Sequence, residues 1–333
     1  MILRRSALLW LLFLVPPALW IGAVLLGRYP IAPCEALGAL VGDRSVPDVV
    51  RSLVVRVRVP RALAAACVGA NLAASGTVFQ ALFHNPLVDA RILGVSSGAA
   101  FGAALALAWS AGPLLVQWSS LAFALLAIGL VVLVGWRHGA STLVLVVAGV
   151  LVSALFSSML GFVKYVADPA DALPAITYWL LGSLSGVRWG NLGPLLAVSA
   201  VSLPLLVVGR WQLNLLTLNT EEARSMGVPI RALRVVALLL ATLLVAVSVS
   251  TSGIVGWIGL IVPHAARSLV GAEHRRMLPV ALALGASVVL VLDTVARTAT
   301  SAELPLGVLT GTIGVPGFLI VLRSVLRRRG EAR

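Results

Sequence analysis

The chain has 333 residues, of which 60% are hydrophobic and only 11% are charged, and its mean hydropathy is +1.04. About a quarter of the residues of a soluble domain are charged, so this composition excludes a soluble globular protein and predicts a polytopic membrane protein with one transmembrane domain over residues 1–333. The net charge of +13 comes from arginine, because Lys164 is the only lysine. No basic stripe with interleaved aromatic residues lies outside the apolar segments, so we expect membrane lipid and no nucleic acid around the chain.

The apolar segments predict an all-α fold with about ten transmembrane helices, since each span needs roughly twenty apolar residues. The first segment follows Arg4 and Arg5 and lacks a clear cleavage site, so we interpret it as a retained span and not as a signal peptide. Residues 172–186 are too short and too polar to cross, and we expect a re-entrant or interfacial helix there. The spans are expected near residues 7–27, 60–81, 92–110, 114–135, 142–165, 191–209, 232–251, 254–270, 278–296 and 306–326.

Arginine and lysine in the loops predict the orientation of the chain. With the N-terminus inside, sixteen of these residues lie on the inner side and nine on the outer side, so we expect both termini in the cytoplasm. Six of the nine outer charges fall between Arg28 and Arg61, against the usual rule, which indicates that they have a function outside. Cys34 and Cys67 form no C-x-x-C motif, and the spacing leaves open whether they are buried thiols or one disulfide.

The run Gly94-Val95-Ser96-Ser97-Gly98 matches the G-x-S-x-G pattern of a serine nucleophile. That pattern needs a strand, a turn and a helix, whereas here it opens an apolar helix. An intramembrane serine protease that pairs Ser96 or Ser97 with His264 is therefore a remote alternative, and packing of small residues between helices is the better interpretation. We predict no catalytic residue and no metal ligand in this chain.

A cytoplasmic loop over about residues 212–230 contains a candidate short helix. Asn219 and Glu222 have the spacing of a helix N-cap, and Gly227 with Pro229 supplies a stop. Apolar residues flank its acidic residues, so the helix either rests on its own membrane domain or docks on a partner. The flanking apolar residues are Leu215, Leu216, Leu218 and Met226.

The segment from Gly253 to Arg276 is apolar but interrupted. Gly253, Gly256 and Gly259 would lie on one face of a helix, and Pro263 would break that helix. A short, broken span that ends in a charged loop is typical of a transporter, so we expect these four positions to act in gating.

Short motifs follow one another in a fixed order from Arg58 to Leu322. They are Arg58-Val59-Pro60-Arg61, Gly69-Ala70-Asn71, Asn85-Pro86-Leu87, Gly94-Val95-Ser96-Ser97-Gly98, Gly182-Ser183-Leu184, Pro263-His264, Asp293-x-x-x-Arg297, Glu303-Leu304-Pro305 and Gly314-x-Pro316-x-Phe318. In this order they resemble the FecCD permease family, the membrane subunits of type II ABC importers for ferric siderophores, haem and vitamin B12. A structural role is expected for Asn85, Pro86, Gly94, Ser96, Gly98, Asp293, Glu303 and Pro305.

The resemblance implies a homodimeric permease in the bacterial inner membrane, with two copies of a separate ATPase below it and one periplasmic substrate-binding protein above it. ATP and Mg would be bound by the ATPase, because a Walker A loop needs a lysine and Lys164 lies inside an apolar span. The pathway would be lined by the second, fifth and tenth spans and by residues 172–186. The expected substrate is haem or a ferric siderophore, with cobalamin as the alternative and a smaller oxyanion last.

The resemblance also implies roles for single residues. Arg58, Arg61 and Arg297 would meet glutamates of the binding protein, although Arg297 could instead pair with Asp293, four residues earlier. The residues expected to couple the permease to the ATPase are Leu218, Thr220, Glu221, Glu222, Arg224 and Gly227.

Overall fold

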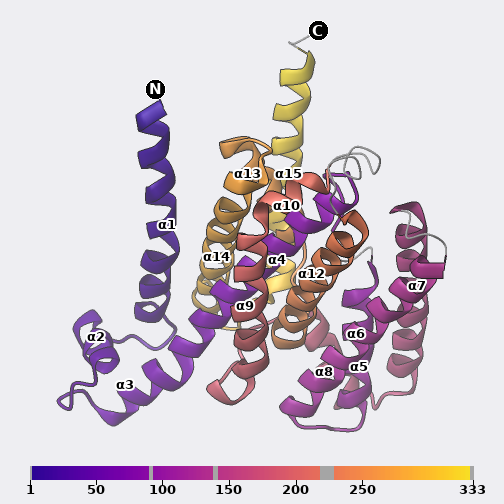
Figure 1. Cartoon of the computed structure of the whole chain (residues 1–333). Helices are drawn as coiled ribbons and strands as arrows, with labels where there is room; N and C mark the ends of the chain where they lie inside the picture. The colour runs from indigo at the N-terminus through magenta and orange to yellow at the C-terminus, as the bar shows by residue number, and fades with distance from the viewer. Residues whose placement is uncertain (1, 90–92, 138–141, 218–228, 331–333) are drawn as a thin grey trace.

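The computed structural model describes residues 2–89, 93–137, 142–217 and 229–330, and the regular secondary structure of this part of the chain is all helix, without a strand (Figure 1). The all-α prediction is therefore confirmed. The elements are α1 (Ile2–Leu25), α2 (Pro33–Val41), α3 (Asp48–Leu53), the π-helical turn η1 (Val54–Arg58), α4 (Val59–Leu82), α5 (Val95–Ala108), α6 (Pro113–Arg137), α7 (Thr142–Val166), α8 (Ala172–Leu181), α9 (Trp189–Val208), α10 (Arg210–Leu215), α12 (Ile230–Ser252), α13 (Ile258–Val270), α14 (His274–Thr298) and α15 (Leu306–Gly330).

Each segment that we predicted to span the membrane coincides with a helix. Six helical stretches are long and apolar enough to cross a bilayer, and five shorter apolar helices accompany them in the described residues. The start of α1 and the end of α15 lie at the same end of the bundle (Figure 1), whereas α2, α3 and α8 lie at the opposite end.

The helix α4 runs obliquely through the middle of the bundle (Figure 1) and packs against α14, α12, α13 and α9. Together with α3 and η1 it forms one continuous helical stretch of 35 residues, and 78% of its most apolar window is buried. Helices of the same chain cover most of this window, and the expectation that the second span lines a pathway stays a prediction. In contrast, only 22% of the corresponding window of α7 is buried.

Glycines allow α4 to approach its neighbours backbone to backbone. A side chain on Gly69 would overlap the carbonyl of Gly285 in α14, and one on Gly76 would overlap Gly259 in α13. In α5, a Cβ on Gly98 would lie 2.5 Å from the carbonyl oxygen of Phe123 in α6. Close helix packing thus explains these three glycines.

Polar residues buried in α4 are bonded to other helices. Asn71 donates to Ser199 Oγ at 2.8 Å and to Ser248 Oγ at 3.3 Å, and Ser75 donates to the carbonyl of Ala241 at 2.9 Å. In lipid these groups have no water to bond, so the pairing fixes how α4, α9 and α12 fit together.

The broken span differs from the prediction. α12 ends at Ser252 and α13 begins at Ile258, so Gly253 and Gly256 lie in a non-helical connection, and Gly253 has a φ of +67°. Pro263 lies inside α13, which continues past it. Proline leaves the carbonyl four residues earlier without its helical donor, and the Nε2 of Gln80 lies 3.4 Å from that carbonyl, at Gly259. The break therefore precedes the proline.

Candidate functional site

Three arginines and two acidic residues from distant parts of the chain meet where α1 ends. We call this group the arginine–carboxylate cluster: Arg58, Arg61, Asp293, Arg297 and Glu303. Arg58 ends η1, and Arg61 lies in the first turn of α4. Asp293 and Arg297 come from the end of α14, and Glu303 comes from the connection between α14 and α15.

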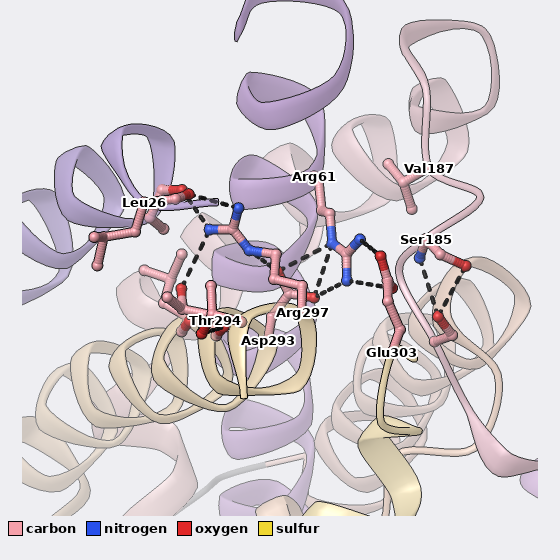
Figure 2. Close-up of polar contacts among 12 residues, drawn as sticks. Leu26, Arg61, Ser185, Val187, Asp293, Thr294, Arg297 and Glu303 are labelled. Carbon is pink, nitrogen blue, oxygen red and sulfur yellow. Dashed lines mark hydrogen bonds and ion pairs between the residues drawn. The ribbon is translucent and has the colours of Figure 1, made fainter. Parts of the chain in front are cut away.

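Arg61 lies between the two carboxylates (Figure 2). Its Nε donates to Asp293 Oδ1 at 3.0 Å, and its Nη2 donates to the same oxygen at 2.9 Å. Its Nη1 and Nη2 donate to Glu303 Oε1 and Oε2, both at 3.0 Å. Both contacts are bidentate, the geometry that makes arginine–carboxylate pairs strong and directional.

Arg58 and Arg297 are directed at the end of α1. The last carbonyls of a helix have no partner inside the helix, and a guanidinium both donates to them and complements the helix dipole. Arg58 and Arg297 donate to the backbone carbonyls of Ala23, Val24, Leu25, Leu26 and Tyr29. The two arginines therefore fasten the end of α1 to α4 and α14.

A π-helical turn, η1, directly precedes α4. Arg58 and Arg61 are three positions apart in the chain. In the structure η1 ends at Arg58, and the Val59 amide bonds to the Val54 carbonyl five residues earlier. Arg58 is directed at the end of α1, while Arg61 is directed at α14 and Glu303.

Burial distinguishes the members of the cluster. Arg58, Arg61 and Arg297 are only 5%, 7% and 7% exposed, and the side chain of Asp293 is 2% exposed. Glu303, at 24%, is the most exposed side chain of the cluster. The three arginines therefore do not present free guanidinium groups on the surface of the single chain, as a simple docking patch would.

The ionic contacts are internal. Arg297 Nε lies 3.5 Å from Asp293 Oδ2, so the alternative of an ion pair with Asp293 is confirmed. Three guanidinium groups and two carboxylates give the cluster a net charge of +1. Burial raises the pKa of Glu303, but the hydrogen bonds and the charge of Arg61 outweigh this effect, so the pKa is lowered from its ordinary value of 4.5.

Other outer arginines are more accessible. Arg44 and Arg56 are exposed, and neither makes a hydrogen bond or ion pair within the described ranges. Arg28 donates to the Thr300 carbonyl at 3.4 Å, and Arg51 pairs with Asp48 at 3.1 Å. The sequence did not single out Arg44 and Arg56, because nothing in their spacing separates an exposed arginine from a buried one.

The predicted coupling residues Leu218, Thr220, Glu221, Glu222, Arg224 and Gly227 lie outside the described residues. The chain before them forms α10. Leu215 is 7% exposed and Leu216 is fully buried, so these two apolar residues pack on their own chain and are not available to a partner.

The remaining predicted positions have structural surroundings. Asn85 Oδ1 accepts the Leu87 amide at 2.9 Å and closes a turn, and Gly94 caps α5 with a φ of +77°. The ring of His264 packs on Phe318 with centroids 5.9 Å apart, and its Nδ1 has no hydrogen-bond partner among the described residues. Cys34 and Cys67 are both free thiols.

A cavity of about 330 Å³ with a mainly apolar lining lies beside α8. Its polar lining is uncharged and includes Gln117, Asn191 and Thr251, and Gln117 Nε2 donates to the Asn191 carbonyl at 2.9 Å and to Thr251 Oγ1 at 3.1 Å. Such a lining can hydrogen-bond neutral groups. Within the described residues, no group of three or more histidine, cysteine or acidic side chains is placed to hold a metal ion.

Comparison with known proteins covers nearly the whole chain. Residues 12–324 match the FecCD transport family. The chain is 38% identical to the molybdate import system permease protein MolB of Haemophilus influenzae, over 91% of each chain, and 38% identical to the hemin transport system permease protein HmuU of Yersinia pestis, over 95% of this chain and 99% of that protein. A solved inward-facing ABC transporter of metal-chelate type superposes with a TM-score of 0.87 at 35% identity, covering 96% of this chain and 99% of that one.

Proposed function

Because the chain belongs to the FecCD transport family and is an ABC importer permease, not an enzyme, we propose that it moves an iron chelate, haem or a ferric siderophore, from the periplasm to the cytoplasm. The observation that carries this proposal is the similarity over almost the full length to a transporter of metal-chelate type. Cobalamin is the second candidate. The relative named for molybdate adds an oxyanion to the substrates that a test must include.

The proposed assembly is a homodimer in the bacterial inner membrane, with both termini in the cytoplasm. The exposed apolar face of α7 supports the membrane location, since the large apolar side chains there need lipid or a second copy of the chain to cover them. Leu143, Leu151, Phe162 and Tyr165 are 73%, 65%, 67% and 88% exposed.

The proposed energy source is a separate ATPase, present in two copies, that binds ATP and Mg. Its closure would act on the loop that contains Glu221 and Glu222, between α10 and α12. Since α12 packs directly on α4, α5, α6 and α9, a displacement of this loop has a short mechanical route into the bundle. The permease would have two packings, and nucleotide binding below would favour one of them.

The proposed binding-protein site is the end of the bundle that carries the arginine–carboxylate cluster. The exposed Arg44 and Arg56 would attract an acidic surface of the partner over a distance. Arg61, in the arginine–carboxylate cluster, would then bind carboxylates of the partner. Charges of this kind set orientation and association rate more than affinity, and salt weakens them.

The test is reconstitution of the permease in proteoliposomes with its ATPase and binding protein. ATP hydrolysis and uptake should be stimulated by haem or a ferric siderophore, and less by cobalamin or molybdate run in parallel. If only molybdate or only cobalamin stimulated ATP hydrolysis and uptake, that compound would be the substrate in place of the iron chelate. Uptake by the permease without ATPase and binding protein would contradict the importer mechanism itself.

A further inference from the structure

Arg61 has one side that a partner can reach, and Glu303 covers it. On the inner side the guanidinium is held by Asp293, whose side chain is 2% exposed. On the other side it is held by Glu303, which is 24% exposed and belongs to the non-helical connection between α14 and α15 (Figure 2). A carboxylate that approaches from outside can therefore meet Arg61 only at the position of Glu303.

We propose that Glu303 is an internal stand-in for a carboxylate of the binding protein, and that docking exchanges one carboxylate for the other at Arg61. This inference rests on the proposed docking function of the cluster. Glu303 is then a positioning residue of the docking site. In the free permease it pairs with Arg61, so the partner must displace it, and its effect on docking affinity is opposite to that of a residue that contacts the partner.

The charge of the cluster limits what can displace Glu303. If Glu303 left without replacement, the balance around three buried guanidinium groups would change from two carboxylates to one. Breaking a buried pair in this way is strongly unfavourable, because it leaves an uncompensated charge. A second carboxylate with bidentate geometry restores the same contacts. The site therefore selects an acidic partner side chain and rejects a neutral one.

The residues after Glu303 connect the exchange to two other helices. The Leu304 amide donates to the Ala296 carbonyl at 3.0 Å, and the Leu306 amide donates to the Gly182 carbonyl at 2.9 Å, directly after α8. Gly307, in the first turn of α15, packs so closely on α8 that a Cβ would lie 2.5 Å from the Leu181 carbonyl oxygen. Movement of Glu303 therefore acts on the end of α8 and the start of α15 together.

The experiment compares Glu303→Gln with wild type in nanodiscs, with docking of the substrate-binding protein measured by surface binding. The amide is a weaker partner for Arg61, so it should be displaced more easily and docking should tighten by about tenfold. Asp48→Asn is the matched control: it removes the same charge at the same end of the bundle, from a side chain that is 95% exposed, and should leave affinity unchanged within about twofold.

Docking by Glu303→Gln that equals or is weaker than docking by wild type would overturn the exchange, provided that wild type docks. If the wild-type permease bound no binding protein, both the proposed docking function and the proposed exchange would be contradicted. A second measurement needs no partner: in free Glu303→Gln, hydrogen exchange at the Leu304 and Leu306 amides should rise, and in Asp48→Asn it should not. Unchanged exchange at these amides would contradict the link to α8 and α15.

Discussion

Gly69 of α4 and Gly285 of α14 meet backbone to backbone, 216 positions apart in the chain. A side chain on either glycine would overlap the backbone of the other helix, so each glycine needs the other at the crossing. Buried contacts of this kind replace the hydrophobic effect, which does not drive helices together inside lipid.

Gly69→Ala should therefore destabilise the protein by about 1–3 kcal/mol, because the extra methyl group forces α4 and α14 apart. The measurement is the thermal unfolding midpoint in detergent. Gly129→Ala in α6 is the control, since a Cβ there meets nothing within 4 Å. Equal midpoints for the two variants would contradict the close crossing.

Asp293→Asn should destabilise the protein by about 3–5 kcal/mol, the usual cost of breaking a buried ion pair. The reason is that Asp293 is the buried counter-ion of both Arg61 and Arg297. Unfolding in denaturant would measure the loss, with Asp48→Asn as an exposed control that stays close to wild type. A small effect in both variants would show that the cluster does not need its buried charge.

Arg58→Lys should loosen the end of α1. The guanidinium donates to three separate carbonyls, and a lysine ammonium cannot reproduce this planar arrangement of donors. We expect faster hydrogen exchange over residues 24–30 and a loss of about 2 kcal/mol in stability. Arg56→Lys, two residues earlier and exposed, should leave both quantities near the wild-type values; if it matched Arg58→Lys, the hydrogen bonds to α1 would not be the cause.

The pairing of Glu303 predicts a pH dependence. Because its pKa is lowered in the folded chain, the contribution of the paired carboxylate to stability is fully present above the ordinary value of 4.5 and is lost as pH falls through the lowered pKa. Wild type should thus lose stability at acid pH relative to Glu303→Gln, which has no carboxylate to protonate. Unfolding midpoints from about pH 7 down to about pH 3 test this, and parallel curves for the two proteins would rule it out.

Glu221→Lys combined with Glu222→Lys should uncouple ATP hydrolysis from uptake in the reconstituted importer. Both residues belong to the loop proposed to contact the ATPase, and reversal of two charges should disrupt that contact. Uptake should fall at least tenfold while the ATPase still hydrolyses ATP. Glu273→Lys, an exposed acidic residue before α14, is the control, and full uptake in the double variant would remove the coupling assignment.

Hydropathy was sufficient to place the helices, because burial in lipid requires long apolar segments that a window detects directly. The ion pair of Asp293 and Arg297 could also be predicted from the sequence, because residues four positions apart lie about one turn apart on the same face of a helix. The contact between Arg61 and Glu303 could not be predicted from the sequence, because the two residues are 242 positions apart and only the folded bundle brings them together. The motif Glu303-Leu304-Pro305 marked the position without indicating its partner.

The interrupted span shows a second limit. Pro263 suggested a break at the proline, but Gln80 of α4 lies near the carbonyl that the proline leaves without a donor, and the helix continues. The chain instead leaves the helix at Gly253, where a positive φ needs glycine. Similarly, the π-helical turn η1, which ends at Arg58, has no signature in the sequence. Local rules indicate where a helix is weak, and distant residues decide where it ends.

The central position of α4 has a consequence for biogenesis. The ribosome makes α4 early, with Arg61 on it, but its partners Asp293 and Glu303 are synthesised more than two hundred residues later. Until then Arg61 lacks its final partners in the bilayer, where isolated charges are costly. A nascent chain that stops before α14 should therefore be an early substrate for membrane proteases, and complete translation is itself the step that protects the first half of the protein.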